Sequence, residues 1–173
     1  MCIVIDTDAL GRVFRATNKE HGEFKPVLDW VLDGQGVVVY GGSTYSGQLA
    51  RAERYVPLLT ELRRYGKVHV AQQDEVDARE RVVRETLRDP QFNDQHIVAI
   101  LLVTGCRLVC TADKQSHKFI ANREFFPNAR NRPRFYGGRK DKRVLCSRNI
   151  PSTFNRRPRL GKAAKQELTA KLP

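Results

Sequence analysis

The chain has 173 residues and a formal net charge of +12, from 31 Lys and Arg against 19 Asp and Glu. That length suits one compact domain with an appendage. The sequence has no run of about 18 apolar residues, so no membrane-spanning helix is predicted, and its start lacks the pattern of a secretory signal. We therefore expect a cytoplasmic protein whose four cysteines are reduced thiols rather than disulfides.

The positive charge is concentrated in one part of the chain. Residues 1–126 contain 17 Lys and Arg and 17 Asp and Glu, whereas residues 127–173 contain 14 and 2. A basic segment attached to a neutral body favours a polyanionic partner, because each contact with a phosphate releases counterions. The alternative is a solubilising or poorly ordered tail.

Hydrophobic patterns at the start of the chain predict alternating strands and helices. Residues 2–6 form an apolar run that ends in an acid, which is typical of a buried strand. One helix is predicted to begin within 8–17 and another to span 24–33. A second buried strand follows over 37–40.

A longer helix is predicted after the second strand. Ser43 or Thr44 is suited to its N-cap, and apolar residues then recur every three or four positions until Gly66. Residues 67–71 read as a third strand, and 75–88 as a charged helix on the surface.

The most apolar helix comes next. Asn93 and Asp94 precede it, and it is apolar nearly all round until Gly105, so a central position is expected. A fourth strand over 107–111 follows. This alternation indicates an α/β fold with a mainly parallel sheet of four or five strands and helices on both faces.

From residue 127 onward, Pro and Gly interrupt a basic segment. Residues 134–136 and 143–146 are predicted to form short edge strands. Residues 160–172 have leucines and an alanine four apart, which predicts a loose helix that no core holds in place.

Three aspartates occupy the ends of predicted elements. Asp6 and Asp113 each follow an apolar strand, and Asp94 begins the most buried helix. Ligands of open parallel sheets bind beyond the carboxyl ends of the strands, so these side chains are expected at one rim. Carboxylates gathered there repel one another unless a cation is present. Mg²⁺ or Mn²⁺ suits such an all-oxygen site and the cleavage of phosphodiester bonds.

Each of these acids except Asp6 also has a structural explanation. Asp94 is a reasonable helix cap, and Asp113 is suited to cap the helix that follows it. Asp8 fits the first turn of a helix better than a ligand position. A carboxylate that closes a buried strand gains little from structure alone, so Asp6 is the hardest to explain without a site.

Four stretches of this sequence resemble the PIN-domain family: residues 3–8, 38–49, 93–99 and 108–114. They cover about residues 1–126. The segment 132–136 is similar to the tail of a bacterial subgroup of PIN-like proteins. The resemblance implies a PIN-like nuclease domain over 1–126 and a basic extension over 127–173, whose first part, to about residue 151, packs on that domain.

The resemblance further implies a three-layer α/β/α fold and metal-dependent cleavage of phosphodiester bonds, usually in RNA. Carried over by position, the metal ligands are Asp6, Asp94 and Asp113, and a water activated by the Mg²⁺ or Mn²⁺ ion is the nucleophile. Many bacterial members of the family are toxins that a partner protein neutralises. The accessory positions beside the ligands are Gln48, Glu53, Asp8 and Thr111.

Gln48 departs from the family pattern, which has an acid at this point of the helix. Glutamine coordinates through its carbonyl oxygen but carries no charge to hold a cation. Glu53 lies about 140° further round a helix at ~100° per residue and is a poor substitute. The predicted function is therefore a metal-dependent endoribonuclease acting mostly on single-stranded RNA, and the alternative is a catalytically weakened nucleic-acid-binding protein.

Basic and aromatic residues mix in the extension, as in surfaces that contact phosphates and stack on bases. The residues predicted to contact nucleic acid are Arg132, Arg134, Tyr136, Arg139, Lys140, Lys142 and Arg143. The expected partners are RNA, with DNA as the alternative substrate, an antitoxin-type protein, or a second copy of the chain.

Overall fold

A single sheet of five strands organises the computed structural model, which describes residues 2–146 and 159–173 of the chain. The strands are β1 (Cys2–Ile5), β2 (Val37–Gly41), β3 (Val68–Ala71), β4 (Leu108–Cys110) and β5 (Arg134–Tyr136). They lie in the order β3-β2-β1-β4-β5, and every neighbouring pair is parallel. The predicted α/β class with a parallel sheet is confirmed, and the predicted strand at 134–136 is the fifth strand.

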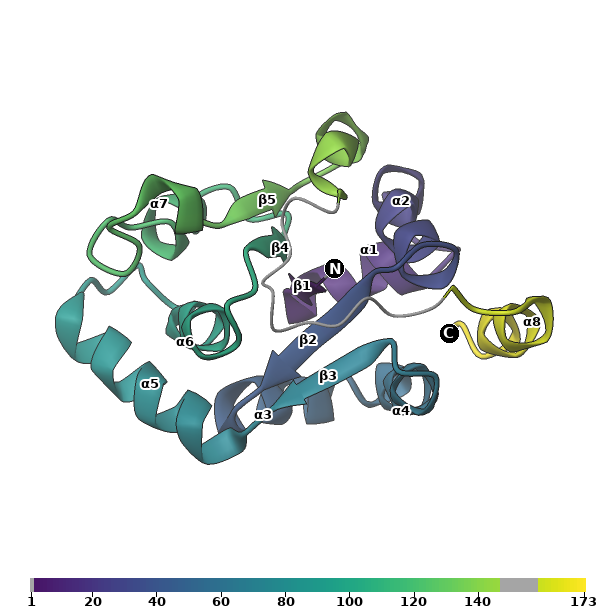
Figure 1. Ribbon diagram of the computed structural model, residues 1–173, viewed down its shortest axis with the longest axis horizontal. Coiled ribbons are helices and arrows are strands. Elements are labelled where there is room, and N and C mark those ends of the chain that lie inside the picture. The colour runs from purple at the N-terminus through teal and green to yellow at the C-terminus, as the bar shows by residue number, and fades with distance from the viewer. Residues whose placement is uncertain (1, 147–158) are drawn as a thin grey trace.

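Helices cover both faces of this sheet, which gives three layers (Figure 1). α1, α2 and α4 lie on one face, whereas α6 packs on the other face and α5 packs against α6. The α-helices are α1 (Leu10–Phe14), α2 (His21–Leu32), α3 (Ser43–Arg51), α4 (Val56–Arg64), α5 (Gln73–Thr86), α6 (Gln95–Thr104), α7 (His117–Ile120) and α8 (Lys162–Ala170). Short 3₁₀ helices are η1 (Thr7–Ala9), η2 (Glu53–Tyr55), η3 (Ala129–Asn131) and η4 (Arg139–Val144).

The central strands are apolar along their whole length because both of their faces are covered. All four residues of β1 and all three of β4 are buried. β3, at the edge of the sheet, instead exposes His69. The expected central helix, α6, is buried from His96 to Leu101 and contacts β1, β2 and β3.

The chain reverses its direction across the sheet between β1 and β4. It passes outward from β1 to β2 and β3, returns over the other face through α5 and α6, and enters β4 on the opposite side of β1. In open parallel sheets the crevice at such a reversal, beyond the carboxyl ends of the two strands, is the usual ligand site. Asp6 follows β1 at this point, and the loop that contains Asp113 follows β4.

The single long helix predicted to end at Gly66 is wrong. α3 ends at Arg51, Ala52 leaves the helical conformation with φ −101° and ψ 42°, and α4 begins at Val56. Pro57 occupies the first turn of α4, where its missing N–H needs no partner. In a continuous helix the ring of Pro57 would collide with the carbonyl of Glu53, so the chain breaks before it.

The N-cap predicted at Ser43 or Thr44 is also wrong. Gly42 occupies the N-cap position of α3 with φ 80°, and the backbone N–H of Ser43 donates to Oδ1 of Asp77 at 2.7 Å. A Cβ at Gly42 would approach Cγ1 of Val76 to 2.6 Å, so this turn needs glycine for both its backbone angle and its packing. Asp77 therefore caps α3 from α5.

The basic segment after β5 differs from its prediction. Residues 143–146 form no strand, because η4 occupies 139–144 and contacts α2. The predicted limit near residue 151 lies outside the described residues. The division of the chain at residue 126 stays a prediction, although the fifth strand lies beyond it.

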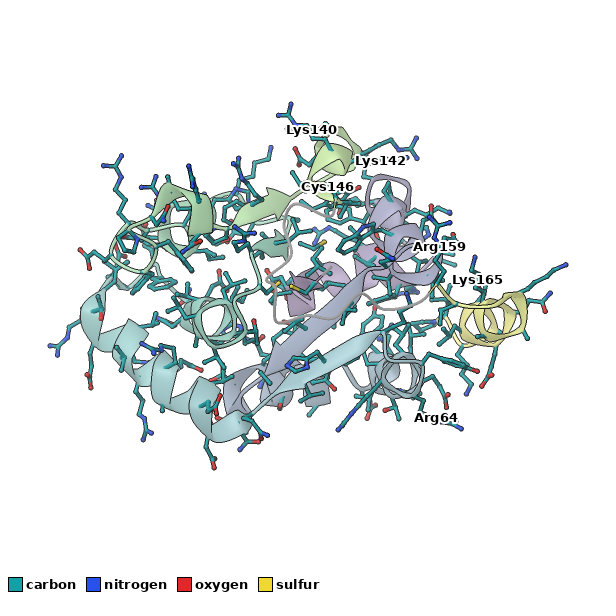
Figure 2. All side chains as sticks on the ribbon, in the orientation of Figure 1. Arg64, Lys140, Lys142, Cys146, Arg159 and Lys165 are labelled. Carbon is teal, nitrogen blue, oxygen red and sulfur yellow. The ribbon has the colours of Figure 1, made fainter. Side chains whose placement is uncertain are left out.

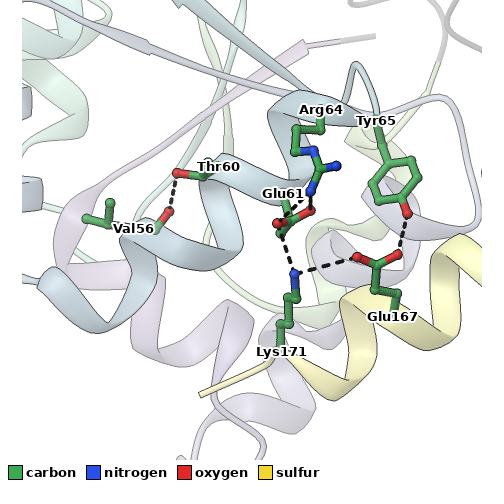
Figure 3. A network of polar contacts seen from close by, with 7 residues as sticks. All are labelled: Val56, Thr60, Glu61, Arg64, Tyr65, Glu167 and Lys171. Atoms are coloured by element: carbon green, nitrogen blue, oxygen red, sulfur yellow. Dashed lines mark hydrogen bonds and ion pairs between the residues drawn. The ribbon is translucent and has the colours of Figure 1, made fainter.

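The C-terminal helix is docked on α4, contrary to the expectation of a loose helix. Leu168 is fully buried, and Lys171 contacts both Glu61 of α4, at 2.9 Å, and Glu167, at 3.5 Å (Figure 3). The hydroxyl of Tyr65 donates to Oε2 of Glu167 at 2.5 Å. Apolar burial rather than these exposed ion pairs is the main contribution to docking.

None of the helices within residues 2–146 and 159–173 has both the length and the apolar character needed to cross a bilayer. Cys2, Cys106 and Cys110 are buried free thiols.

Leu168→Ala tests the docking of α8. The substitution leaves a cavity under the helix, and we expect it to lower the free energy of unfolding by about 2–4 kcal/mol. Thr169→Ala, at the exposed neighbouring position, is the control and should change it by less than about 0.5 kcal/mol. Urea unfolding followed by circular dichroism measures both, and equal stability of the two variants would show that α8 does not contribute to the core.

Candidate active site

Asp6 is held rigidly at the end of β1. Its backbone N–H donates to the carbonyl of Cys110 at 2.9 Å, which extends the ladder between β1 and β4. Its side chain is only 9% exposed, and Oδ2 accepts a 2.8 Å hydrogen bond from Oγ1 of Thr111. The hydroxyl of Tyr45, on α3, donates to the carbonyl of Ile5 at 2.6 Å and ties that helix to the same strand end.

Asp113 is connected to Asp6 through Thr111. Oγ1 of Thr111 accepts from the backbone N–H of Asp113 at 3.1 Å while it donates to Asp6. Oδ1 of Asp113 accepts from the N–H of Gln115 at 2.7 Å, within a turn. Asp113 does not cap α7, whose N-cap is Ser116, so the capping alternative does not account for it.

Asp94 occupies the N-cap position of α6, but its carboxylate makes no capping hydrogen bond. The N-cap position of Asp94 agrees with the capping alternative, whereas its hydrogen bonds do not. Because the side chain of Asp94 accepts no hydrogen bond from the N–H groups of the first turn, capping does not explain an acid at this position. Its carboxylate instead faces the same cavity as Asp6.

One cavity of about 460 Å³ joins these residues. It lies beyond the carboxyl ends of β1 and β4, and the residues that line it come from the loops after these strands, from α3 and from the approach to α6. They are Asp6, Thr7, Asp8, Gln48, Arg51, Ala52, Gln91, Asn93, Asp94 and Asp113. The three acids predicted as ligands, which are up to 107 positions apart in the sequence, therefore share one space.

The carboxylates in this cavity repel one another. Burial raises the pKa of Asp94 to about 6, and the negative charges of Asp6 and Asp113 add to this increase. Burial also raises the pKa of Asp6, although the hydrogen bond from Thr111 opposes the change. Among the described residues that line the cavity, Arg51 is the one basic side chain. The cavity is thus short of positive charge, which is the condition that favours a bound cation.

The oxygen ligands of this cavity are of the type that binds a hard divalent cation, but they do not form a complete coordination shell. Carboxylate, amide and hydroxyl oxygens are ligands of Mg²⁺ and Mn²⁺. Within the described part of the chain, however, no group of three His, Cys, Asp or Glu side chains is arranged to hold a metal ion. Mg²⁺ usually keeps several waters and takes one or two carboxylates together with substrate phosphates. The site fits that open mode, and simultaneous coordination by Asp6, Asp94 and Asp113 is not present.

The accessory residues behave differently from one another. Gln48 lines the cavity, and its Oε1 accepts a 2.9 Å hydrogen bond from Oγ1 of Thr7. Asp8 lines it as an exposed side chain, and Thr111 acts through Asp6. Glu53 lies on η2, beyond the break at Ala52, and does not line the cavity. The angle expected between Gln48 and Glu53 assumed one continuous helix, so it does not apply to Glu53.

Four polar lining residues were not predicted from the sequence: Thr7, Arg51, Gln91 and Asn93. Arg51 lies three positions after Gln48, which places both on one face of α3, so helical spacing was a usable signal. Thr7 and Asn93 are direct neighbours of predicted ligands. No pattern in the sequence points to Gln91.

The predicted nucleic-acid-binding residues divide into two groups. Tyr136 is fully buried, and its hydroxyl donates to the carbonyl of Glu23, so it cannot stack on a base. Arg132 and Arg139 donate to the backbone carbonyls of Phe126 and Gly22, which gives them structural partners. The remaining four are exposed: Arg134, Lys140, Lys142 and Arg143.

Asp94→Asn should make the protein more stable at neutral pH. The aspartate titrates near ~3.9 in the unfolded chain and at about 6 in the folded one. Between these values the folded state binds more protons, so stability falls as pH rises through this window and stays lower above it. In EDTA, the variant should melt above the wild type at about pH 7.5, and the difference should vanish near about pH 4.

Glu85→Gln is the control for this substitution, since Glu85 is exposed on α5, and it should leave the melting temperature unchanged. A variant Asp94→Asn that melts below the wild type at about pH 7.5 would mean that the carboxylate stabilises the fold and is not strained by its neighbours.

Comparison with known proteins gives this chain no relative: no family model, no curated protein and no solved structure matches it. The resemblance of its four motifs to PIN domains therefore stays a prediction, and its function is argued from its own side chains.

Proposed function

We propose that this protein is a metal-dependent endoribonuclease that cleaves phosphodiester bonds, mostly in single-stranded RNA. One observation carries the proposal: Asp6, Asp94 and Asp113 line a single cavity at the reversal of the sheet, and none of them forms an ion pair with another described residue. Acids in a crevice whose pKa values are raised, as those of Asp6 and Asp94 are, are typical of functional sites. The rigid attachment of Asp6 through Thr111 supports a positioned ligand.

The protein side chains would divide the work in this cavity. Asp94, with a pKa of about 6, can accept a proton from water and release it again near neutral pH. Arg51 can contact a phosphate oxygen of the substrate. Asp6 and Asp113 would hold Mg²⁺ or Mn²⁺. When bound, the ion supplies positive charge that activates water and neutralises the leaving oxygen.

The proposal includes partners and a location. RNA is the proposed substrate, with DNA as the alternative, because the excess positive charge of the chain favours a polyanion. A toxin role with an antitoxin-type partner, or a homodimer, follows only from the resemblance to bacterial PIN proteins. Three buried free thiols support a reducing cytoplasmic compartment.

A second candidate function is nucleic-acid binding with weak or no catalysis. Gln48 favours it, because this side chain faces the cavity with its amide oxygen already accepting a hydrogen bond from Thr7. A neutral residue here leaves the cavity with less charge to attract a cation than an acid would.

Asp6→Asn distinguishes the two functions. If the protein is a nuclease, the purified wild type should degrade single-stranded RNA with Mn²⁺ or Mg²⁺, and the variant should be slower by about 100-fold or more. Glu85→Gln serves as the control and should retain full activity. Undiminished cleavage by Asp6→Asn, or by the wild type in excess EDTA, would falsify the metal-dependent mechanism.

Gln48→Glu tests whether this residue weakens an otherwise intact centre. A glutamate has nearly the same shape and can still accept the hydrogen bond from Thr7. The added charge should tighten Mn²⁺ binding and raise the rate of cleavage at low metal concentration by about tenfold. Calorimetric titration with Mn²⁺ and a rate assay measure these effects, and a weaker metal affinity in the variant would refute the interpretation of Gln48.

A further inference from the structure

A second cavity, of about 460 Å³, lies beside the acidic one and has the opposite charge. Four basic side chains line it: Lys114, from the loop after β4, Arg134, from β5, and Lys140 and Arg143, from η4. η4, which carries Lys140 and Lys142, stands at the edge of the molecule and is open to solvent (Figure 2). We refer to this space as the basic cavity.

The basic cavity and the acidic cavity share a wall. Asp113 lines the acidic one, and Lys114, the next residue, lines the basic one. The loop between them is fixed, because the N–H of Thr111 donates to the carbonyl of Tyr136 at 3.2 Å and so extends the pairing of β4 with β5. Successive residues of one loop therefore line the two cavities.

Ion pairs among the described residues leave the basic side chains of this cavity without a partner. Within the described residues, none of the four basic side chains has an ion pair or a side-chain hydrogen bond. Asp141, the acid among the described lining residues, accepts a hydrogen bond from the N–H of Gly137 at 3.0 Å instead of pairing with a cation. Unpaired Lys and Arg around a concave space are suited to a phosphate group.

An aromatic pair forms another part of the lining. The rings of His117 and Phe135 are stacked, with centroids 3.8 Å apart and an angle of 11° between the planes. Both side chains are partly exposed. Aromatic rings beside a basic groove are the usual platform for the bases of single-stranded nucleic acids.

From these observations we infer that the basic cavity binds the phosphate group next to the scissile one in a single-stranded RNA, with the adjoining base against Phe135. This inference rests on the proposed nuclease function and adds a direction to the substrate path, from the acidic cavity over Asp113 to η4. It also narrows the predicted interface. Arg134, Lys140 and Arg143 contact the substrate together with Lys114, whereas Arg132, Tyr136 and Arg139 maintain the fold.

The triple variant Arg134→Ala, Lys140→Ala, Arg143→Ala tests the inference by binding alone. Fluorescence anisotropy in EDTA, with a labelled oligouridylate of about 12 nucleotides, should show affinity reduced by about tenfold or more. The slope of log affinity against log salt should become shallower by about 0.7, since the contact with one phosphate is removed. The variant Lys19→Ala, Arg79→Ala, Arg88→Ala loses the same charge elsewhere on exposed positions and should bind nearly as the wild type does.

A rate assay with Mn²⁺ then locates the cavity relative to the scissile bond. The dinucleotide UpU has no phosphate besides the scissile one, so the triple variant should cleave the oligouridylate about tenfold more slowly and UpU at the wild-type rate. Cleavage of the oligonucleotide without cleavage of UpU by the wild type would also support the flanking contact.

The outcomes separate this inference from the proposed function. Equal binding of RNA by the triple variant and its charge-matched control overturns the inference, even if both cleave RNA. An equal loss of rate on UpU and on the oligonucleotide also overturns it, since the contact would then be at the scissile phosphate. Loss of binding in a protein whose wild type never cleaves RNA supports the phosphate site and refutes the nuclease.

Discussion

Burial of carboxylates beside one another at the end of a parallel sheet is the constraint on which the site depends. The topology brings the ends of β1 and β4 together, and Asp6 and the loop of Asp113 continue from them. Asp94 joins them from α6, where burial and its neighbours raise its pKa to about 6. A fold keeps such an arrangement at a cost to its stability, so a role beyond structure is the simplest account of it.

The surrounding contacts hold the acids in place rather than relieve their repulsion. Thr111 donates to Asp6 and accepts from the backbone of Asp113, and Tyr45 fixes α3 against the end of β1. Asp6, Thr111 and Tyr45 are all buried. Beside this acidic space lies a basic one, and the pair of opposite fields would hold a polyanion on one side while a cation compensates the other. In the proposed function, a metal ion compensates the acids when the substrate approaches them.

Much of this could be predicted from local patterns, because strands buried on both faces are apolar throughout and their carboxyl ends share one edge. Asp6 and Asp113 follow from that rule alone. The break between α3 and α4 at Ala52 was not predicted, because the helical period of apolar residues continues through it. Pro57 is the residue in the sequence that indicates this break. The docking of α8 could not be foreseen: Leu168 shows the period of a helix, but only the three-dimensional surface of α4 gives it a partner.

Charge composition was the least specific guide. It marked Arg139 and Tyr136 as nucleic-acid contacts as readily as Arg134. The first two instead donate hydrogen bonds to carbonyls of α2, more than a hundred positions away in the sequence. It also gave no weight to Lys114 and Arg51, which belong to segments that are neutral on average. Whether a basic side chain faces a ligand depends on which carbonyl groups the fold places within its reach, and sequence composition does not contain that information.

An anomalous difference map from a crystal soaked in Mn²⁺ shows whether the acidic cavity binds a cation. We expect a peak inside this cavity, with at least one carboxylate oxygen of Asp6, Asp94 or Asp113 at about 2.1 Å from the ion. A map without a peak in that cavity, obtained from crystals whose other surface acids have bound Mn²⁺, would contradict this expectation.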